Sequence, residues 1–145
     1  MKTLLALLAL LLPLAILPLA ARPASAQPLP EIPTIQVPPA GASITGKLGP
    51  GGRNLYYVSA QSLQALSVTL TSAGNVAVFQ VYGPGAQVGP GSNGVPAVTG
   101  TTLTDASAKD APLAWMGVVP QSGLCLIAVD STAGPTVYTL AVTLQ

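Results

Sequence analysis

The chain has 145 residues, of which 50% are hydrophobic and only 6% are charged, and it contains no histidine and a single cysteine. The absence of histidine excludes Ser-His-Asp and Cys-His catalysis and removes the commonest nitrogen ligand of metals. The chain has only five basic residues and a formal net charge of +1, so we expect no basic stripe of the kind that nucleic acid or anionic lipid requires. We therefore expect a non-catalytic binding protein with no cofactor, no metal and no nucleic-acid partner.

The first 26 residues have the layout of a cleavable bacterial signal peptide. Lys2 gives a positive start, an uncharged apolar run follows, and Ala24-Ser25-Ala26 supplies small residues where signal peptidase must fit. The alternative is an uncleaved membrane anchor, because the apolar run is just long enough to span a bilayer. However, Pro13 and Pro18 would each remove a helical hydrogen bond. We predict cleavage after Ala26 and export to the periplasm or the cell exterior, with no membrane contact afterwards.

The next segment, residues 27–41, is rich in proline, with five prolines between positions 27 and 39. Such a stretch forms neither a helix nor a central strand, so it predicts an extended linker or N-terminal arm. After the arm, no charged residue lies between Arg53 and Asp105. The charged side chains of the exported part nearly cancel, and they are Glu31, Lys47, Arg53, Asp105, Lys109, Asp110 and Asp130.

From residue 42 to residue 145 the sequence has the period-two pattern of β-strands. Residues 66–71 alternate strictly between apolar and hydroxyl side chains, and residues 75–82 are apolar at nearly every position, as in a strand covered on both faces. Turn residues separate the strands at the spacing of a sandwich. The predicted strands are 43–48, 53–60, 66–71, 75–82, 113–119, 123–129 and 137–144.

Residues 83–100 form the longest interruption, with six glycines, three prolines and no charge. We expect a loop here. A loop of this length in a compact domain is usually functional or mobile. A disordered insertion between two strands is equally consistent with the composition.

Aromatic residues and the cysteine are the other candidates. Trp115 either stacks on a sugar, anchors an interface or packs at the edge of the core. Tyr56 and Tyr57 are neighbours on a predicted strand, so their side chains point to opposite faces and one of them belongs to the core. We treat Tyr57 as a candidate binding residue. Cys125 has apolar neighbours and no nearby cation, so we expect a buried, unreactive thiol.

Asp105, Lys109 and Asp110 lie in one short polar connection. A glycosidase needs two carboxylates that face each other across a cleft, and a calcium loop needs a glycine-bracketed spacing that is missing here. The favoured interpretation is a solvated loop, and these three residues are candidates for contact with a partner.

Several short motifs between Ile44 and Leu144 resemble a known family. They are Gly46–Leu48, Tyr56–Val58, Leu66–Leu70, Val78–Pro84, Gly117–Gly123 and Tyr138–Val142. The set resembles the bacterial pre-peptidase C-terminal domain and the related periplasmic inhibitors of g-type lysozyme. The most telling element is a proline, one residue and then Ser-Gly at the start of a strand, here Pro120-Gln121-Ser122-Gly123. The family usually has an aromatic residue where this chain has Cys125.

The resemblance implies an all-β, jelly-roll-like antiparallel β-sandwich of seven to eight strands. It also implies a self-standing secreted module that binds an envelope component, a polysaccharide or a protein, or that inhibits a peptidoglycan hydrolase. Glycan binding predicts exposed aromatic rings on a sheet face, whereas inhibition predicts a protruding polar loop. A partner with a basic cleft is usually contacted by acidic side chains, and here only Asp105, Asp110 and Asp130 are available for this.

The solvent faces of the strands carry serine and threonine in place of charges, which predicts weak self-association. Two features counter it. The last strand, residues 137–144, is expected in the middle of a sheet, and the proline-rich arm is expected to cover one sheet edge.

Overall fold

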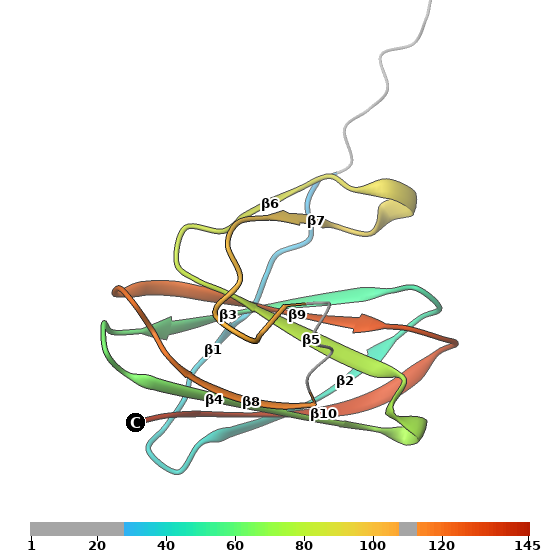
Figure 1. The fold of residues 1–145 in the computed structure, drawn as a ribbon. Helices are drawn as coiled ribbons and strands as arrows, with labels where there is room; N and C mark the ends of the chain where they lie inside the picture. Colours follow the sequence, from blue (N-terminus) through green and yellow to red (C-terminus); the bar gives the residue numbers. More distant parts are fainter. Residues whose placement is uncertain (1–27, 108–112) are drawn as a thin grey trace, which may run out of the picture.

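The computed structural model describes residues 28–107 and 113–145, and the regular secondary structure in these ranges is mainly β-strand (Figure 1). In the described part, no helix is long and apolar enough to cross a membrane. The strands are β1 (Thr34–Ile35), β2 (Ala42–Leu48), β3 (Arg53–Ala60), β4 (Ala65–Ser72), β5 (Ala77–Tyr82), β6 (Gln87–Gly89), β7 (Ala97–Thr99), β8 (Ala114–Val118), β9 (Gly123–Ser131) and β10 (Thr136–Leu144).

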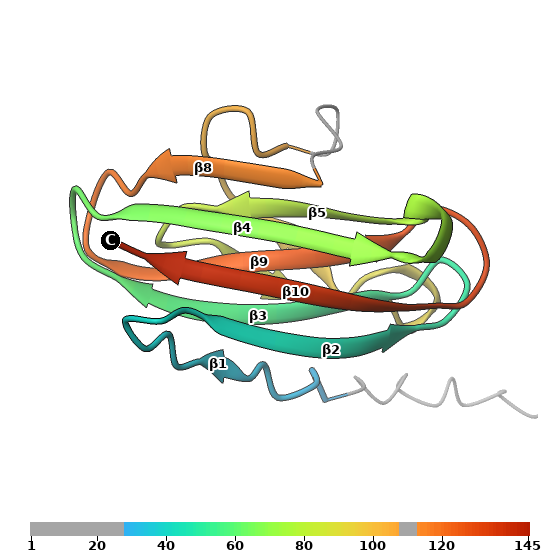
Figure 2. The same ribbon diagram turned by 90° about the horizontal axis from the view of Figure 1, so that it is seen from below.

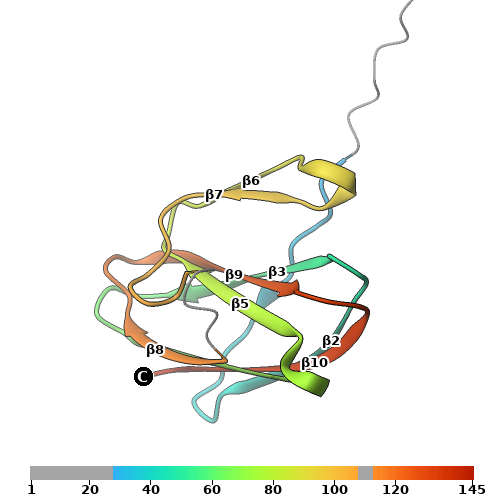
Figure 3. The same ribbon diagram turned by 45° about the vertical axis from the view of Figure 1, so that its right-hand side comes forward.

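Two four-stranded sheets pack face to face, with strand orders β1-β3-β9-β5 in sheet A and β2-β10-β4-β8 in sheet B. The two layers are seen edge-on in Figure 1 and Figure 3, and sheet B is seen from its outer face in Figure 2. The predicted all-β sandwich and all seven predicted strands are confirmed. Among the strands that the structure describes, the one parallel pair is the short β1–β3 pair.

The core lies between the inner faces of the two sheets. On β10, side chains alternate between the core and the outer face, and Leu140 and Val142 are fully buried. On β9, Cys125, Ile127 and Val129 all face the same core, as the alternation predicted. A fully buried aliphatic side chain contributes about 1.5–3 kcal/mol, so these two central strands hold the sandwich together.

Inside the core, one polar cluster joins the two sheets. The Tyr56 hydroxyl of sheet A hydrogen-bonds the Tyr138 hydroxyl of sheet B at 2.5 Å, and Asn54 Nδ2 donates to the same Tyr138 oxygen at 2.8 Å. Tyr138 fits because its ring lies over Gly46, where an added Cβ would stand 2.3 Å from the ring. The glycine therefore makes room for the aromatic ring.

Residues 83–100, expected as a loop, contain the β6–β7 hairpin, which lies above sheet A in Figure 1 and Figure 3. Asn93 and Gly94 at its tip take left-handed φ values of 55° and 75°, which these residue types tolerate. Apolar side chains of the hairpin and arm cover the outer face of sheet A. They include Val88 and Val98, packed on Leu55, Tyr82, Leu126 and Ala128.

The proline-rich arm runs along the outer edge of β3. Thr34 and Ile35 pair in parallel with Tyr57 and Val58, and the Tyr57 amide donates to the Pro33 carbonyl at 2.9 Å. Ile35 is only 7% exposed. The arm therefore covers a sheet edge, as its composition led us to expect.

Candidate functional site

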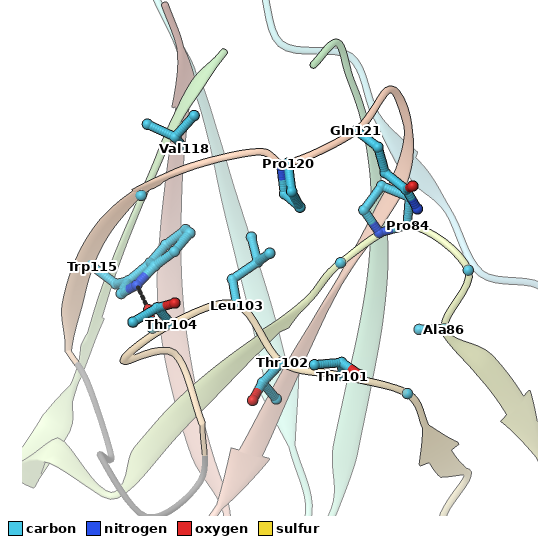
Figure 4. Close-up of a pocket in the computed structure, with 14 residues that line it drawn as sticks. Pro84, Ala86, Thr101, Thr102, Leu103, Thr104, Trp115, Val118, Pro120 and Gln121 are labelled. Atoms are coloured by element: carbon cyan, nitrogen blue, oxygen red, sulfur yellow. Dashed lines mark hydrogen bonds between the residues drawn. The ribbon is translucent and has the colours of Figure 1, made fainter. Parts of the chain in front are cut away.

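A pocket of about 710 Å³ opens between the β5 edge of sheet A and the β8 edge of sheet B (Figure 4). Three chain segments surround it: residues 83–86 after β5, residues 100–104 after β7, and residues from Trp115 to Gln121 in β8 and the turn that follows. These segments are distant in sequence, and only the closed sandwich brings them together.

The segment after β7 forms one side of the pocket because it hydrogen-bonds the outer edge of β5. Val81 donates its amide to the Ala106 carbonyl at 3.0 Å and accepts from the Leu103 amide at 2.8 Å. Gly83 donates to the Thr101 carbonyl at 3.0 Å. This pairing covers the β5 edge and holds Leu103 among the pocket-lining side chains (Figure 4).

Trp115 forms the opposite side. Its side chain is 8% exposed and its Nε1 donates to the Thr104 carbonyl at 2.8 Å, as the dashed line in Figure 4 shows. The indole lies over Gly117, where an added Cβ would stand 2.3 Å from the ring. The ring is therefore fixed at the edge of the core, and it lines the pocket without forming an exposed platform.

Of the residues that the structure describes, those that line the pocket carry no charged side chain. The polar groups at the pocket come from Thr101, Thr102, Thr104, Gln121 and the backbone, while leucine, valine, proline and the indole supply apolar surface. A site of this composition suits an uncharged group that combines hydrogen-bonding edges with an apolar face.

Beside the pocket, the β3–β4 turn and the β8–β9 turn are locked together, and we call residues 61–64 and 119–122 the turn pair. Ser62 N donates to Ser122 Oγ at 2.9 Å, and Ser62 Oγ donates to the Pro120 carbonyl at 3.2 Å. The Leu63 amide donates to the Val119 carbonyl at 2.9 Å. Leu63 has a left-handed φ of 70° and is 79% exposed, so an apolar side chain protrudes from a rigid base.

The Ser-Gly motif has a local reason in this structure. Gly123 has a φ of 152°, and an added Cβ would stand 2.8 Å from Cβ of Pro84. The glycine thus lets the β8–β9 turn approach the end of β5, and the preceding Ser122 fixes the neighbouring turn. The Ser-Gly motif therefore helps to hold the turn pair in place.

The other candidate residues do not gather at the pocket. Tyr57 is half-buried on the outer face of sheet A and packs with the cluster under the hairpin. Asp105 is exposed, with a φ of 58°, directly after the Thr104 carbonyl that holds Trp115. Lys109 and Asp110 lie outside the described residues. Of the candidates that the structure describes, only Trp115 and Asp105 are therefore near each other.

One ion pair was not anticipated from the sequence. Arg53 Nε donates to Asp130 Oδ1 at 2.6 Å and Nη2 donates to Oδ2 at 3.0 Å. Hydrogen bonding to Asp130 raises the pKa of Arg53 against the lowering effect of burial. Asp130 also accepts from Gln80 Nε2 at 2.9 Å, so this carboxylate is engaged within the fold.

No protein-family model matches the chain, and no curated protein sequence matches it. Its fold, however, is shared with solved structures of small periplasmic proteins that inhibit g-type lysozyme. For PliG of Aeromonas hydrophila, a periplasmic inhibitor of g-type lysozyme, the TM-score is 0.57 at 25% identity, over 79% of this chain and 95% of that chain. For PliG of Salmonella Typhimurium, the TM-score is 0.54 at 14% identity, over 80% of this chain and 100% of that chain.

A mutant of the Escherichia coli PliG superimposes with a TM-score of 0.50 at 13% identity, over 78% of this chain and 96% of that chain. The two more distant likenesses concern the fold alone. The likeness to the Aeromonas hydrophila protein supports the lysozyme-inhibitor part of the resemblance seen in the sequence motifs.

Proposed function

We propose that this protein is a periplasmic inhibitor of a peptidoglycan hydrolase of the g-type lysozyme class. The observation that carries the proposal is the likeness to the Aeromonas hydrophila inhibitor, which extends over 95% of that chain at 25% identity. We infer that the protein acts by occupying the cleft of the enzyme, which requires no chemistry of its own. The absence of histidine from the chain agrees with such a role.

The turn pair is the part that we assign to the enzyme cleft. Its two turns are held by four hydrogen bonds between them, so little conformational freedom is lost on binding. Leu63 and the pocket-lining Pro120 and Gln121 offer an apolar and neutral contact surface next to the pocket. Asp130 is engaged with Arg53, so it does not contribute an acidic contact.

The test is inhibition of purified g-type lysozyme, with a c-type lysozyme as the selectivity control. We expect Leu63→Ala and Gln121→Ala each to raise the half-inhibitory concentration about tenfold, as for a contact worth about 1.4 kcal/mol. Val137→Ala is the matched control, since Val137 is also exposed, at 51%, but lies outside the turn pair. Because the contact surface is neutral, inhibition should change little between low and high salt.

A protein that leaves g-type lysozyme fully active at a large molar excess contradicts the proposal. Equal inhibition of g-type and c-type enzymes contradicts the class of hydrolase. Equal loss of inhibition in the Val137→Ala control contradicts the assignment to the turn pair.

A glycan-binding module is the second candidate, and the uncharged pocket of about 710 Å³ favours it. Against it stand the aromatic residues. Glycan binding predicted exposed rings on a sheet face, but Tyr57 is half-buried and every other aromatic side chain of the sequence is buried. Calorimetry with purified peptidoglycan fragments separates the two functions, because a glycan module binds these fragments without any enzyme present.

Two points support the proposed compartment: the predicted signal sequence, which lies outside the described residues, and the periplasmic location of the similar proteins. We propose cleavage between Ala26 and Gln27. Mass spectrometry of the exported protein should find Gln27 at the N-terminus, and a retained Met1 would favour the membrane-anchor alternative.

A further inference from the structure

Two sheets have four outer edges, and three of them are protected in this structure. The β3 edge is covered by β1, and the β5 edge is covered by residues 101–106. The β2 edge strand turns Ser43, Thr45 and Lys47 to solvent, and a lysine on an edge strand discourages pairing with another chain. The remaining edge is β8.

Within residues 28–107 and 113–145, the β8 strand has none of these protections. The three residues whose side chains face solvent are Ala114, Met116 and Val118, and Met116 and Val118 are 72% and 59% exposed. The strand contains no charge and no proline. In Figure 2, β8 lies at the margin of sheet B, beyond β4.

The backbone of β8 also has hydrogen-bonding groups that point toward its open edge. The Leu113 carbonyl accepts from the Leu70 amide at 2.7 Å, and the Val119 amide donates to the Gln64 carbonyl at 2.9 Å. Odd-numbered residues therefore bond to the β4 side. Since hydrogen-bonding direction alternates along an antiparallel strand, the even-numbered residues of β8 aim their N–H and C=O groups at the open edge. No strand among the described residues pairs with β8 on that side.

We propose that the β8 edge is the docking surface for a second copy of this chain, paired antiparallel about a two-fold axis at Met116. The strand is self-complementary in this register. Ala114 lies opposite Val118 of the partner subunit, which sets a small side chain against a larger one. Trp115 lies opposite Gly117 of the partner subunit. No like charges meet, and sheet B continues into the sheet B of the second copy.

The predicted dimer is weak and reversible. A five-residue strand buries much less than the roughly 800 Å² per partner of a standard stable interface, so it belongs to the transient class. We expect a dissociation constant on the order of 10–100 µM. The inference does not rest on the proposed inhibition, and the two experiments that test it directly involve no enzyme.

The first experiment is analytical ultracentrifugation of the exported protein over a concentration series. Wild type should shift from monomer to dimer, and Met116→Lys should stay monomeric because two like charges would meet at the two-fold axis. Thr45→Lys is the matched control: it places a lysine at the exposed centre of the other sheet B edge strand and should associate like wild type. Circular dichroism melts check that both variants fold.

The second experiment tests the register by disulfide trapping. The two Met116 Cα atoms would lie about 5.5 Å apart as a hydrogen-bonded pair, within the roughly 4.4–6.8 Å span of disulfides. Under mild oxidation, Met116→Cys should cross-link efficiently, while Ala114→Cys and Thr45→Cys should cross-link little. The native Cys125 is fully buried and should not interfere.

A wild-type protein that remains monomeric throughout the series overturns the proposal, as does equal cross-linking of the three cysteine variants. The proposal is also overturned if the wild-type protein is monomeric and Met116→Lys loses lysozyme inhibition. In that case the β8 edge would bind the enzyme and not a second copy of the chain.

Discussion

Arg53 and Asp130 stand directly opposite each other on β3 and β9 and form a two-point ion pair, at 2.6 Å and 3.0 Å, on the outer face of sheet A. The third contact of the guanidinium goes to the hairpin segment, where Nη1 donates to the Pro96 carbonyl at 3.2 Å. Asp130 in turn holds Gln80, whose Oε1 accepts from the Tyr82 hydroxyl at 2.7 Å. This network joins the hairpin to the sheet.

We predict that Asp130→Ala loosens the hairpin more than it destabilises the sandwich. The side chains of Arg53 and Asp130 are both about one-fifth exposed. The substitution removes the carboxylate that accepts hydrogen bonds from Arg53 and Gln80, which should lower the free energy of unfolding by about 1–2 kcal/mol. Hydrogen exchange should accelerate in peptides from residues 83–100. Lys47→Ala, which removes an exposed cation elsewhere, should leave that exchange unchanged. Unaltered exchange in Asp130→Ala would show that apolar packing alone holds the hairpin.

We predict that stability falls in alkali. Burial, followed by the hydrogen bond with Tyr56, raises the pKa of Tyr138 above its ordinary value of 10.0. The folded state therefore keeps the phenolic proton that the unfolded state loses. This contribution is fully present below pH 10 and is lost as the pH rises further, at up to about 1.4 kcal/mol per pH unit.

Urea unfolding at pH 8, 10 and 11 measures this loss, and Tyr138→Phe should show a shallower decline. Some decline should remain in the variant, because burial also raises the pKa of Tyr82 and of Cys125. An equally steep decline in both proteins would show that Tyr138 does not govern the alkaline limit.

We predict that the Cys125 thiol reacts with maleimide only when the protein opens. Its side chain has no exposed area, and burial raises its pKa, so little thiolate forms and little reagent reaches it. Val137→Cys in the same protein provides an exposed reference site, since Val137 is 51% exposed. The exposed site should label about a thousandfold faster, as for an opening free energy of several kcal/mol. Comparable native rates would contradict the core position of Cys125.

We predict that deleting residues 27–39 leaves a folded sandwich that self-associates through β3. The deletion removes β1 and the burial of Ile35, at a cost of about 1.5–3 kcal/mol, and it frees the Tyr57 amide. The deletion should be made in the Met116→Lys background, so that association through β8 does not obscure the result. Light scattering should then detect dimers or larger species. Matching monomeric profiles with and without the arm would show that the β3 edge does not self-associate when it is uncovered.

The sandwich could be predicted because its strands are marked by local alternation. Residues 66–71 show the inward and outward faces directly, and the apolar run 75–82 correctly indicated a strand covered on both sides. The hairpin was missed because its two strands have three residues each and are interrupted by glycine and proline. It forms through contacts with Leu126 and Arg53, which no local pattern reveals.

The candidate site was harder to predict because it is assembled from distant segments. Trp115 was identified as a candidate, yet its partner, the Thr104 carbonyl, is a backbone group without a sequence signal. Tyr57 was identified from its strand position, but the hairpin that half-buries it was unknown. The turn pair depends on Ser62 and Ser122, which are sixty residues apart and look like ordinary turn residues.

The strand order has a consequence for how the chain reaches its folded state. In sheet A, β3 and β5 meet only through β9, and in sheet B, β2 and β4 meet only through β10. Until these two late strands are available, the chain can form only the pairs β1–β3, β4–β8 and β6–β7. Most pairing is thus long-range in sequence, which slows folding because loops must close first. A nascent chain would therefore lack most of its strand pairs until late in its synthesis, and the proposed export through a membrane translocation channel requires such an unfolded chain.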